Sequence, residues 1–352
     1  MFITGLGTAT PIHRYEQAQF WAALQASERF AQLSSRSRAI LRKVLAGNNG
    51  IRTRHLALET LGEAFDLTPD ALHARFLNNA PTLAAQAAQN AMADAQVEPE
   101  SIDAVIVSTC TGYLCPGLTS YVSGQLGLRP EVLALDLVGQ GCVAALPNLS
   151  TAEALLGAGT CERVLSICVE VCSAAFYLDD DPGVLISACL FADGAGAAVL
   201  SSAPSEGRRR VEWKASSSVL NPEDRDLLRF EQRNGMLRNV LTPQVPAKAA
   251  VQAERVFHAV LTRSGLRREQ VAAWVFHPGG RDVLLALRER LGLSANDVRW
   301  SEAVLAEYGN MSSPSVLFAL QSSLSNGVPN GLWWMSSFGA GFSCHGAILE
   351  VS

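Results

Sequence analysis

Short apolar segments alternate with longer helical segments along most of this chain, and this alternation restricts its fold more than any other feature. Segments 104–108, 163–171 and 272–276 are mostly apolar and have the length of buried strands. Segments with helical spacing of apolar residues lie between them, including 81–96 and 248–264. Apolar strands that alternate with helices favour an α/β protein whose sheets are covered on both faces.

The composition agrees with a large interior. Hydrophobic residues make up 48% of the 352 residues and charged residues only 17%, which argues against disorder and indicates apolar surface buried between subunits. The polar and basic segment 204–210 separates two series of strands and helices. We therefore expect a domain boundary near residue 205, with one half at 1–205 and the other at 206–352.

Charge and cysteine content exclude several classes of protein. The net charge of −5 gives no general attraction for nucleic acid or for an anionic membrane. We expect no membrane span and no signal peptide, because no apolar segment has the length or flanking charges of either. The eight cysteines form no C-x-x-C pair and the six histidines do not cluster with them, so we expect no metal site. Most of the eight cysteines are expected to be buried free thiols, which are typical of a reducing compartment, so we expect a cytoplasmic protein.

The segment 135–147 suggests a nucleophile. It places Cys142 after an apolar strand, behind Gly139 and Gly141, and before an alanine-rich helix. The two glycines permit the sharp turn of a strand-to-helix elbow, and the N–H groups at a helix start stabilise a thiolate. Cys142 is therefore a candidate nucleophile, and a buried structural cysteine is the alternative.

Two further residues stand at positions suited to chemistry. His277 follows the predicted strand 272–276, and open α/β sheets bind ligands where strands end. Asn310 precedes a predicted helix, and its amide can bind a developing oxyanion. The alternatives are a structural histidine and a simple helix cap.

Five short motifs, in this order along the chain, resemble the type III polyketide synthases, the chalcone and stilbene synthase family of the thiolase superfamily. The motifs are 109–117, 140–142, 190–195, 276–280 and 309–313. The resemblance implies an α/β thiolase-like fold, with two pseudo-symmetric halves in α-β-α-β-α layers, and a homodimer. It also implies that an acyl-CoA starter condenses with malonyl-CoA by decarboxylative Claisen chemistry through an acyl-cysteine, followed by cyclisation. These coenzyme A thioesters are substrates, and no further cofactor is implied.

The resemblance also assigns roles to individual residues. Cys142 matches the family nucleophile, and His277 and Asn310 match its two partners. Phe191 matches the aromatic gatekeeper between the coenzyme A tunnel and the cavity, whereas 236–241 contains no second gatekeeping phenylalanine. The other cavity positions, including a glycine-rich loop that commonly has proline in place of Ala340, are Cys110, Thr111, Cys172, Ala175, Ser187, Gly339, Ala340 and Gly341. Candidates for binding coenzyme A phosphates are Arg38, Arg42, Lys43, Arg52 and Arg54.

The small side chains among these cavity positions, together with segment 237–246, are similar to those of bacterial members that make alkylpyrones or alkylresorcinols. They predict a long aliphatic starter. A ketoacyl synthase III-like enzyme that uses an acyl carrier protein, a cysteine hydrolase and a non-catalytic binding protein stay open as alternatives. The sequence determines neither the starter, nor the number of extensions, nor the mode of cyclisation.

Overall fold

A nine-stranded sheet runs through the molecule in this computed structural model, which describes residues 1–352. The strand order is β11-β12-β13-β8-β1-β7-β6-β4-β5. In chain order these strands are β1 (Phe2–Ala9), β4 (Ala104–Thr109), β5 (Leu133–Val138), β6 (Arg163–Val171), β7 (Asp193–Ser201), β8 (Val211–Leu220), β11 (Val271–Phe276), β12 (Gly331–Gly339) and β13 (Ser343–Val351). Two short antiparallel pairs lie apart from it, formed by β2 (Arg14–Glu16) with β3 (Thr53–His55) and by β9 (Leu228–Arg233) with β10 (Met236–Leu241).

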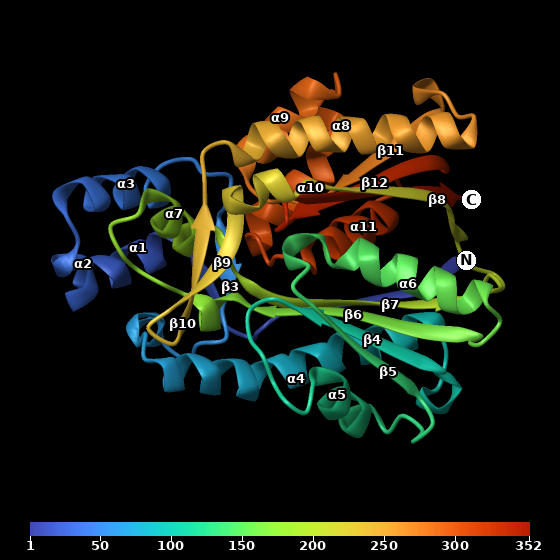
Figure 1. Ribbon diagram of the computed structural model, residues 1–352, viewed down its shortest axis with the longest axis horizontal. Helices are drawn as coiled ribbons and strands as arrows, with labels where there is room; N and C mark the ends of the chain where they lie inside the picture. The colour runs from blue at the N-terminus through green and yellow to red at the C-terminus, as the bar shows by residue number, and fades with distance from the viewer.

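Eleven α-helices cover the strands (Figure 1). They are α1 (Gln17–Ala26), α2 (Glu28–Gln32), α3 (Ser35–Leu45), α4 (Pro69–Ala95), α5 (Leu118–Leu126), α6 (Ala145–Gly157), α7 (Pro182–Leu190), α8 (Val245–Ser264), α9 (Arg281–Arg290), α10 (Ala295–Tyr308) and α11 (Ser315–Ser325). No helix is long and apolar enough to span a membrane.

The sheet consists of two halves that repeat one pattern of pairing. In the first half, β1 and β6 both pair antiparallel with β7, and β4 pairs parallel with β6 and with β5. In the second half, β8 and β12 both pair antiparallel with β13, and β12 pairs parallel with β11. The halves meet at a single pair, Phe2 with Glu212. We propose that the chain divides between β7 and β8, a connection that contains the boundary expected at residue 205.

Helices and half-sheets alternate in five layers (Figure 1). Helix α4 packs on β1, β6 and β7, and α8 packs on β8 and β13 at the opposite side of the molecule. Between the half-sheets lie α6 and α11, whose apolar side chains form one core with strands of both halves, as Leu149, Leu317 and Met335 illustrate. Coverage of both faces explains why β4, β6 and β7 are almost wholly buried and mostly apolar. The predicted α/β architecture is confirmed.

One predicted helix was too short. The segment 81–96 was expected to begin a helix at Pro81, but α4 begins at Pro69 and contains Pro81 in its interior. Proline usually starts or interrupts a helix because it lacks an N–H donor. Here the Thr68 side chain accepts a hydrogen bond from the Ala71 N–H and caps the helix, and Pro69 supplies the proline that is favourable at a first turn.

Candidate active site

A sharp turn at the end of β5 positions Cys142. Gly139 and Gly141 have φ angles of 81° and 61°, a left-handed conformation that glycine adopts without strain. Cys142 then lies in a short 3₁₀ turn, Gly141–Val143, which leads into α6. Its side chain is buried. The predicted strand-to-helix elbow is therefore present.

The predicted glycine-rich loop packs against this elbow. A Cβ atom at Gly339 would lie 3.1 Å from the Cys142 backbone nitrogen and 2.8 Å from that of Val143, so a larger residue would displace the turn. Ala340 lies against Gly141 on the same side. Gly341, in contrast, faces Leu220. Gly339 and Ala340 thus fix the position of the cysteine, and Gly341 does not reach it.

Asn310 is joined to Cys142 through Ser312. The Ser312 hydroxyl donates a hydrogen bond to the Cys142 sulfur over 3.2 Å, and its backbone N–H donates to Asn310 Oδ1 over 2.8 Å. Asn310 Nδ2 donates to the carbonyl oxygen of Gly279 over 3.0 Å. Ser312 has a φ of 59°, which is uncommon outside glycine and costs energy. The surrounding contacts hold it in this conformation beside the sulfur.

His277 lies at the end of β11, two residues before the glycine that Asn310 contacts. Its ring is buried, packs edge-on against Phe338 at 5.3 Å between ring centroids, and has no hydrogen-bond partner on either nitrogen. Burial lowers the pKa of His277 to about 3, so the imidazole is neutral at physiological pH. No hydrogen bond joins the His277 ring to Cys142 in this structure.

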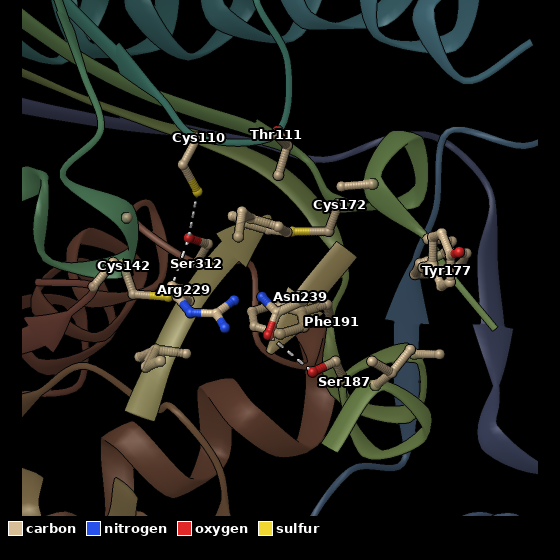
Figure 2. Close-up of a pocket in the computed structure, with 18 residues that line it drawn as sticks. Cys110, Thr111, Cys142, Cys172, Tyr177, Ser187, Phe191, Arg229, Asn239 and Ser312 are labelled. Atoms are coloured by element: carbon tan, nitrogen blue, oxygen red, sulfur yellow. Dashed lines mark hydrogen bonds between the residues drawn. The ribbon is translucent and has the colours of Figure 1, made fainter. Parts of the chain in front are cut away.

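A mostly apolar pocket opens at Cys142, and 12 of its 18 lining residues are hydrophobic (Figure 2). All the predicted cavity residues except two glycines line it: Cys110, Thr111, Cys172, Ala175, Ser187, Phe191 and Ala340. The sequence analysis did not identify further lining residues, among them Phe176, Leu228, Arg229, Phe230, Asn239 and Ser312.

Comparison with known proteins identifies the family. Residues 12–222 match the family described as FAE1/Type III polyketide synthase-like protein, and 214–349 match the chalcone and stilbene synthase C-terminal domain. The chain belongs to the type III polyketide synthase family. The predicted resemblance is confirmed.

Individual relatives agree with this assignment. A 3,5-dihydroxyphenylacetyl-CoA synthase of Streptomyces toyocaensis is 32% identical over 69% of this chain, and the match spans 64% of that relative's length. The α-pyrone synthesis polyketide synthase-like Pks18 of Mycobacterium tuberculosis is 28% identical over 99% of this chain and 91% of its own. The crystal structure of PKS-I from the brown alga Ectocarpus siliculosus superimposes with a TM-score of 0.89 and 26% identity, covering 99% of this chain and 97% of that one. These matches confirm the thiolase-like fold.

A buried carboxylate that the sequence analysis missed lies behind Cys142. Glu170 on β6 accepts hydrogen bonds from Thr109, the Cys110 backbone and thiol, Thr111, Ser312 and Ser313. Burial raises the pKa of Glu170 above its ordinary value, and these donors oppose that effect. A carboxylate in the interior of a mostly apolar strand was the available signal for a buried functional group.

Two neighbours affect the acidity of Cys142 in opposite directions. Burial is the main effect and raises the pKa of the thiol to about 12, and the charge of Glu170 raises it further, whereas the Ser312 hydrogen bond lowers it. The Ser312 hydroxyl lies 3.2 Å from the Cys142 sulfur and 3.3 Å from Glu170 Oε1. Its one proton can therefore be donated to either atom.

We predict opposite changes in cysteine reactivity when these neighbours are replaced. Ser312→Ala removes a donor to the thiolate, so the pKa of Cys142 rises and alkylation by iodoacetamide between pH 7 and 9 slows about two- to tenfold. Glu170→Gln removes a negative charge, so the pKa falls and alkylation accelerates. Mass spectrometry of the Cys142 peptide across this pH range measures both rates. A shift in the same direction for both variants would contradict this account.

The five candidate coenzyme A ligands of this family member fall into two groups. Arg38, Arg42 and Lys43 are exposed on α3, and Arg52 is exposed and paired with Glu307. Arg54 is fully buried and donates hydrogen bonds of 2.8 Å to the backbone oxygens of Ala188 and Phe191. The predicted phosphate-binding role is therefore wrong for Arg54. Its guanidinium holds the end of α7, and thereby Phe191, in place.

A second, small apolar cavity adjoins this pocket. Phe176 and Ala188 line both spaces, so they form the wall between them. The remaining walls come from α1, α3 and the segment near Phe65, namely Phe20, Leu24, Leu41, Ala64, Phe65 and Leu178. No polar residue lines this second cavity.

Proposed function

We propose that this protein is a polyketide synthase that condenses an acyl-CoA starter with malonyl-CoA through a thioester on Cys142. The observation that carries the proposal is the position of the Cys142 sulfur, which opens into an apolar pocket and is joined through Ser312 to Asn310. The family membership supports it, because the relatives include named polyketide synthases.

The first step in this proposal is acylation of Cys142. The thiolate attacks the carbonyl carbon of the acyl-CoA thioester, and the coenzyme A thiolate leaves. We assign the acceptance of the Cys142 proton to His277, because its imidazole is neutral and both ring nitrogens are free of other partners. Burial in an apolar pocket then protects the thioester from water.

The second step is decarboxylation of malonyl-CoA with its thioester carbonyl oxygen facing His277 and Asn310. The bond to the carboxylate carbon breaks, carbon dioxide leaves, and the electron pair forms an enolate on that oxygen. Asn310 Nδ2 uses one N–H for Gly279 and retains the other for the enolate. N–H donors in a water-poor site stabilise such a charge strongly. The enolate carbon attacks the acyl carbonyl, and Cys142 leaves as thiolate.

We propose an aliphatic starter. The small residues Cys172, Ala175 and Ala188 leave room in the pocket, and the wholly apolar second cavity begins behind Phe176. Hydrocarbon chains gain free energy from burial in such a space, about 0.8 kcal/mol per CH₂ group. An alkylpyrone or alkylresorcinol product agrees with this cavity.

The test is mass spectrometry of the products formed from malonyl-CoA and starters with short, aromatic and long aliphatic acyl groups. We expect cyclised products with two or more extensions, formed best from an aliphatic starter. Phe176→Ala joins the two cavities and should shift the preference toward longer chains. Preference for a bulky aromatic starter would contradict the aliphatic assignment. A single condensation onto an acyl carrier protein would instead support a ketoacyl synthase III-like enzyme.

We also propose a homodimer located in the cytoplasm, where coenzyme A thioesters and reduced thiols occur. The edge strand β5 supports the dimer, because its apolar residues Leu133 and Val138 are exposed and only one edge of the strand is paired. An exposed apolar edge strand tends to pair with another chain. A monomeric mass in light scattering would contradict this proposal.

A further inference from the structure

Asn239 is a polar residue in the wall of the mostly apolar pocket. It lies on β10 directly opposite Phe230 of β9, and more than nine-tenths of its surface is buried. Both residues line the space that contains the Cys142 sulfur. In the view of Figure 2, Asn239 lies between Cys142 and Ser187, beside Phe191. The segment in which no second gatekeeping phenylalanine was found thus contributes an amide to the pocket.

One end of this amide has a protein partner and the other does not. The Ser187 hydroxyl lies 3.1 Å from Asn239 Oδ1 and 2.9 Å from the carbonyl oxygen of Gly183, and it can donate its one proton to either oxygen. Nδ2 makes no hydrogen bond within the protein, although an amide nitrogen carries two donors. This nitrogen stays accessible from the pocket, where water can accept its hydrogen bonds. A ligand that carries an acceptor can take the place of that water.

The charges around Asn239 favour a neutral acceptor over a carboxylate. The nearby Arg229 guanidinium is already paired with Asp226 and Glu231, at 2.9 and 2.7 Å. Arg238, the next residue before Asn239, is paired with Asp179, Asp181 and Glu231. No unpaired cation therefore remains on this wall to hold an anion. A ketone oxygen is an uncharged acceptor that a single amide N–H satisfies.

We propose that Asn239 donates a hydrogen bond to the β-carbonyl oxygen of a β-ketoacyl chain in the pocket. This inference rests on the proposed function, because each condensation leaves a ketone two carbons from the thioester. A saturated starter has no such oxygen. Asn239 therefore favours retention of the extended chain over the unextended starter and promotes further extension. Ser187 is a positioning residue that orients the amide with Nδ2 toward the ligand.

The test compares acetoacetyl-CoA with butyryl-CoA, which differ at the β-carbon only. Calorimetry on Cys142→Ala protein measures both affinities without acyl transfer. We expect acetoacetyl-CoA to bind about three- to tenfold more tightly, as one added hydrogen bond allows. Asn239→Leu should abolish this preference for acetoacetyl-CoA. Asn239→Val is a second variant with the same expected result, and its side chain suits a strand. Ser187→Ala should reduce the preference. Asn78→Leu on the exposed face of α4 is the matched control.

The same preference in the Asn239→Leu and Asn239→Val proteins as in the parent would overturn the inference. So would equal affinities of the parent for the two thioesters. Thermal unfolding of each variant identifies loss of folding independently. Failure of the proposed function has a different signature, namely no product from wild-type protein with malonyl-CoA, whatever the ratio of affinities. The binding ratio therefore reports on Asn239 alone.

Discussion

Alanine in place of Cys142 is expected to reduce polyketide formation by about a thousandfold or more, because no thiol then remains at the elbow to hold the acyl group. The Cys142 side chain is the thiol at the elbow, and α6 begins directly after it. Transfer of a radiolabelled acyl group from its CoA thioester to the protein should become undetectable. Decarboxylation of malonyl-CoA should continue at a reduced rate, because His277 and Asn310 are unchanged. The two activities therefore separate in one variant.

Cys161→Ala is the matched control for this experiment. Cys161 is as deeply buried as Cys142, but it belongs to the central core and does not line the pocket. Its replacement should leave acylation and product formation within about twofold of wild type, since only a small packing change results. Retained acylation in Cys142→Ala protein, or an equal loss in Cys161→Ala protein, would show that another group holds the chain.

The features that could be predicted from the sequence are those determined by a few adjacent residues. The strand, the two glycines and the alanine-rich segment around Cys142 predict an elbow, and an elbow is present. The roles of Cys142, His277 and Asn310 stay predictions. The structure brings their backbone segments together through Ser312 and Gly279, but it forms no hydrogen bond from the His277 ring to the sulfur.

Features that depend on distant segments could not be predicted in the same way. Glu170 is surrounded by donors that lie about 60 and 142 residues away along the chain, and no local pattern reveals those contacts. Asn239 reaches the pocket because the β9–β10 hairpin folds over the pocket. The hairpin sequence is polar and typical of a solvent-exposed loop. Arg54 was grouped with the exposed basic residues because it lies near them in the sequence and carries the same positive charge. Its burial depends on the end of α7, which lies more than 130 residues away.

The free nitrogens of His277 are consistent with a site arranged for a charge that appears only during reaction. A buried imidazole with no acceptor and no donor is costly in the resting protein. Asn310, in contrast, is fixed at both ends of its amide, by Ser312 and by Gly279. A fixed donor and an unpaired donor, on segments linked to Cys142 through Ser312 and Gly279, suit an oxygen that carries little charge at first and a full charge after carbon dioxide leaves.

Replacement of these donors should reduce malonyl-CoA decarboxylation about a hundred- to thousandfold, the usual effect of losing one preorganised donor to an oxyanion. Asn310→Ala removes the amide, and Asn310→Asp should be worse, because a carboxylate repels the enolate. His277→Gln keeps an N–H donor of similar reach and should retain more activity than His277→Ala. Release of labelled carbon dioxide measures the rate, and thermal unfolding of each variant checks that the fold remains intact. A decarboxylation rate within about twofold of wild type in the alanine variants would show that other groups stabilise the enolate.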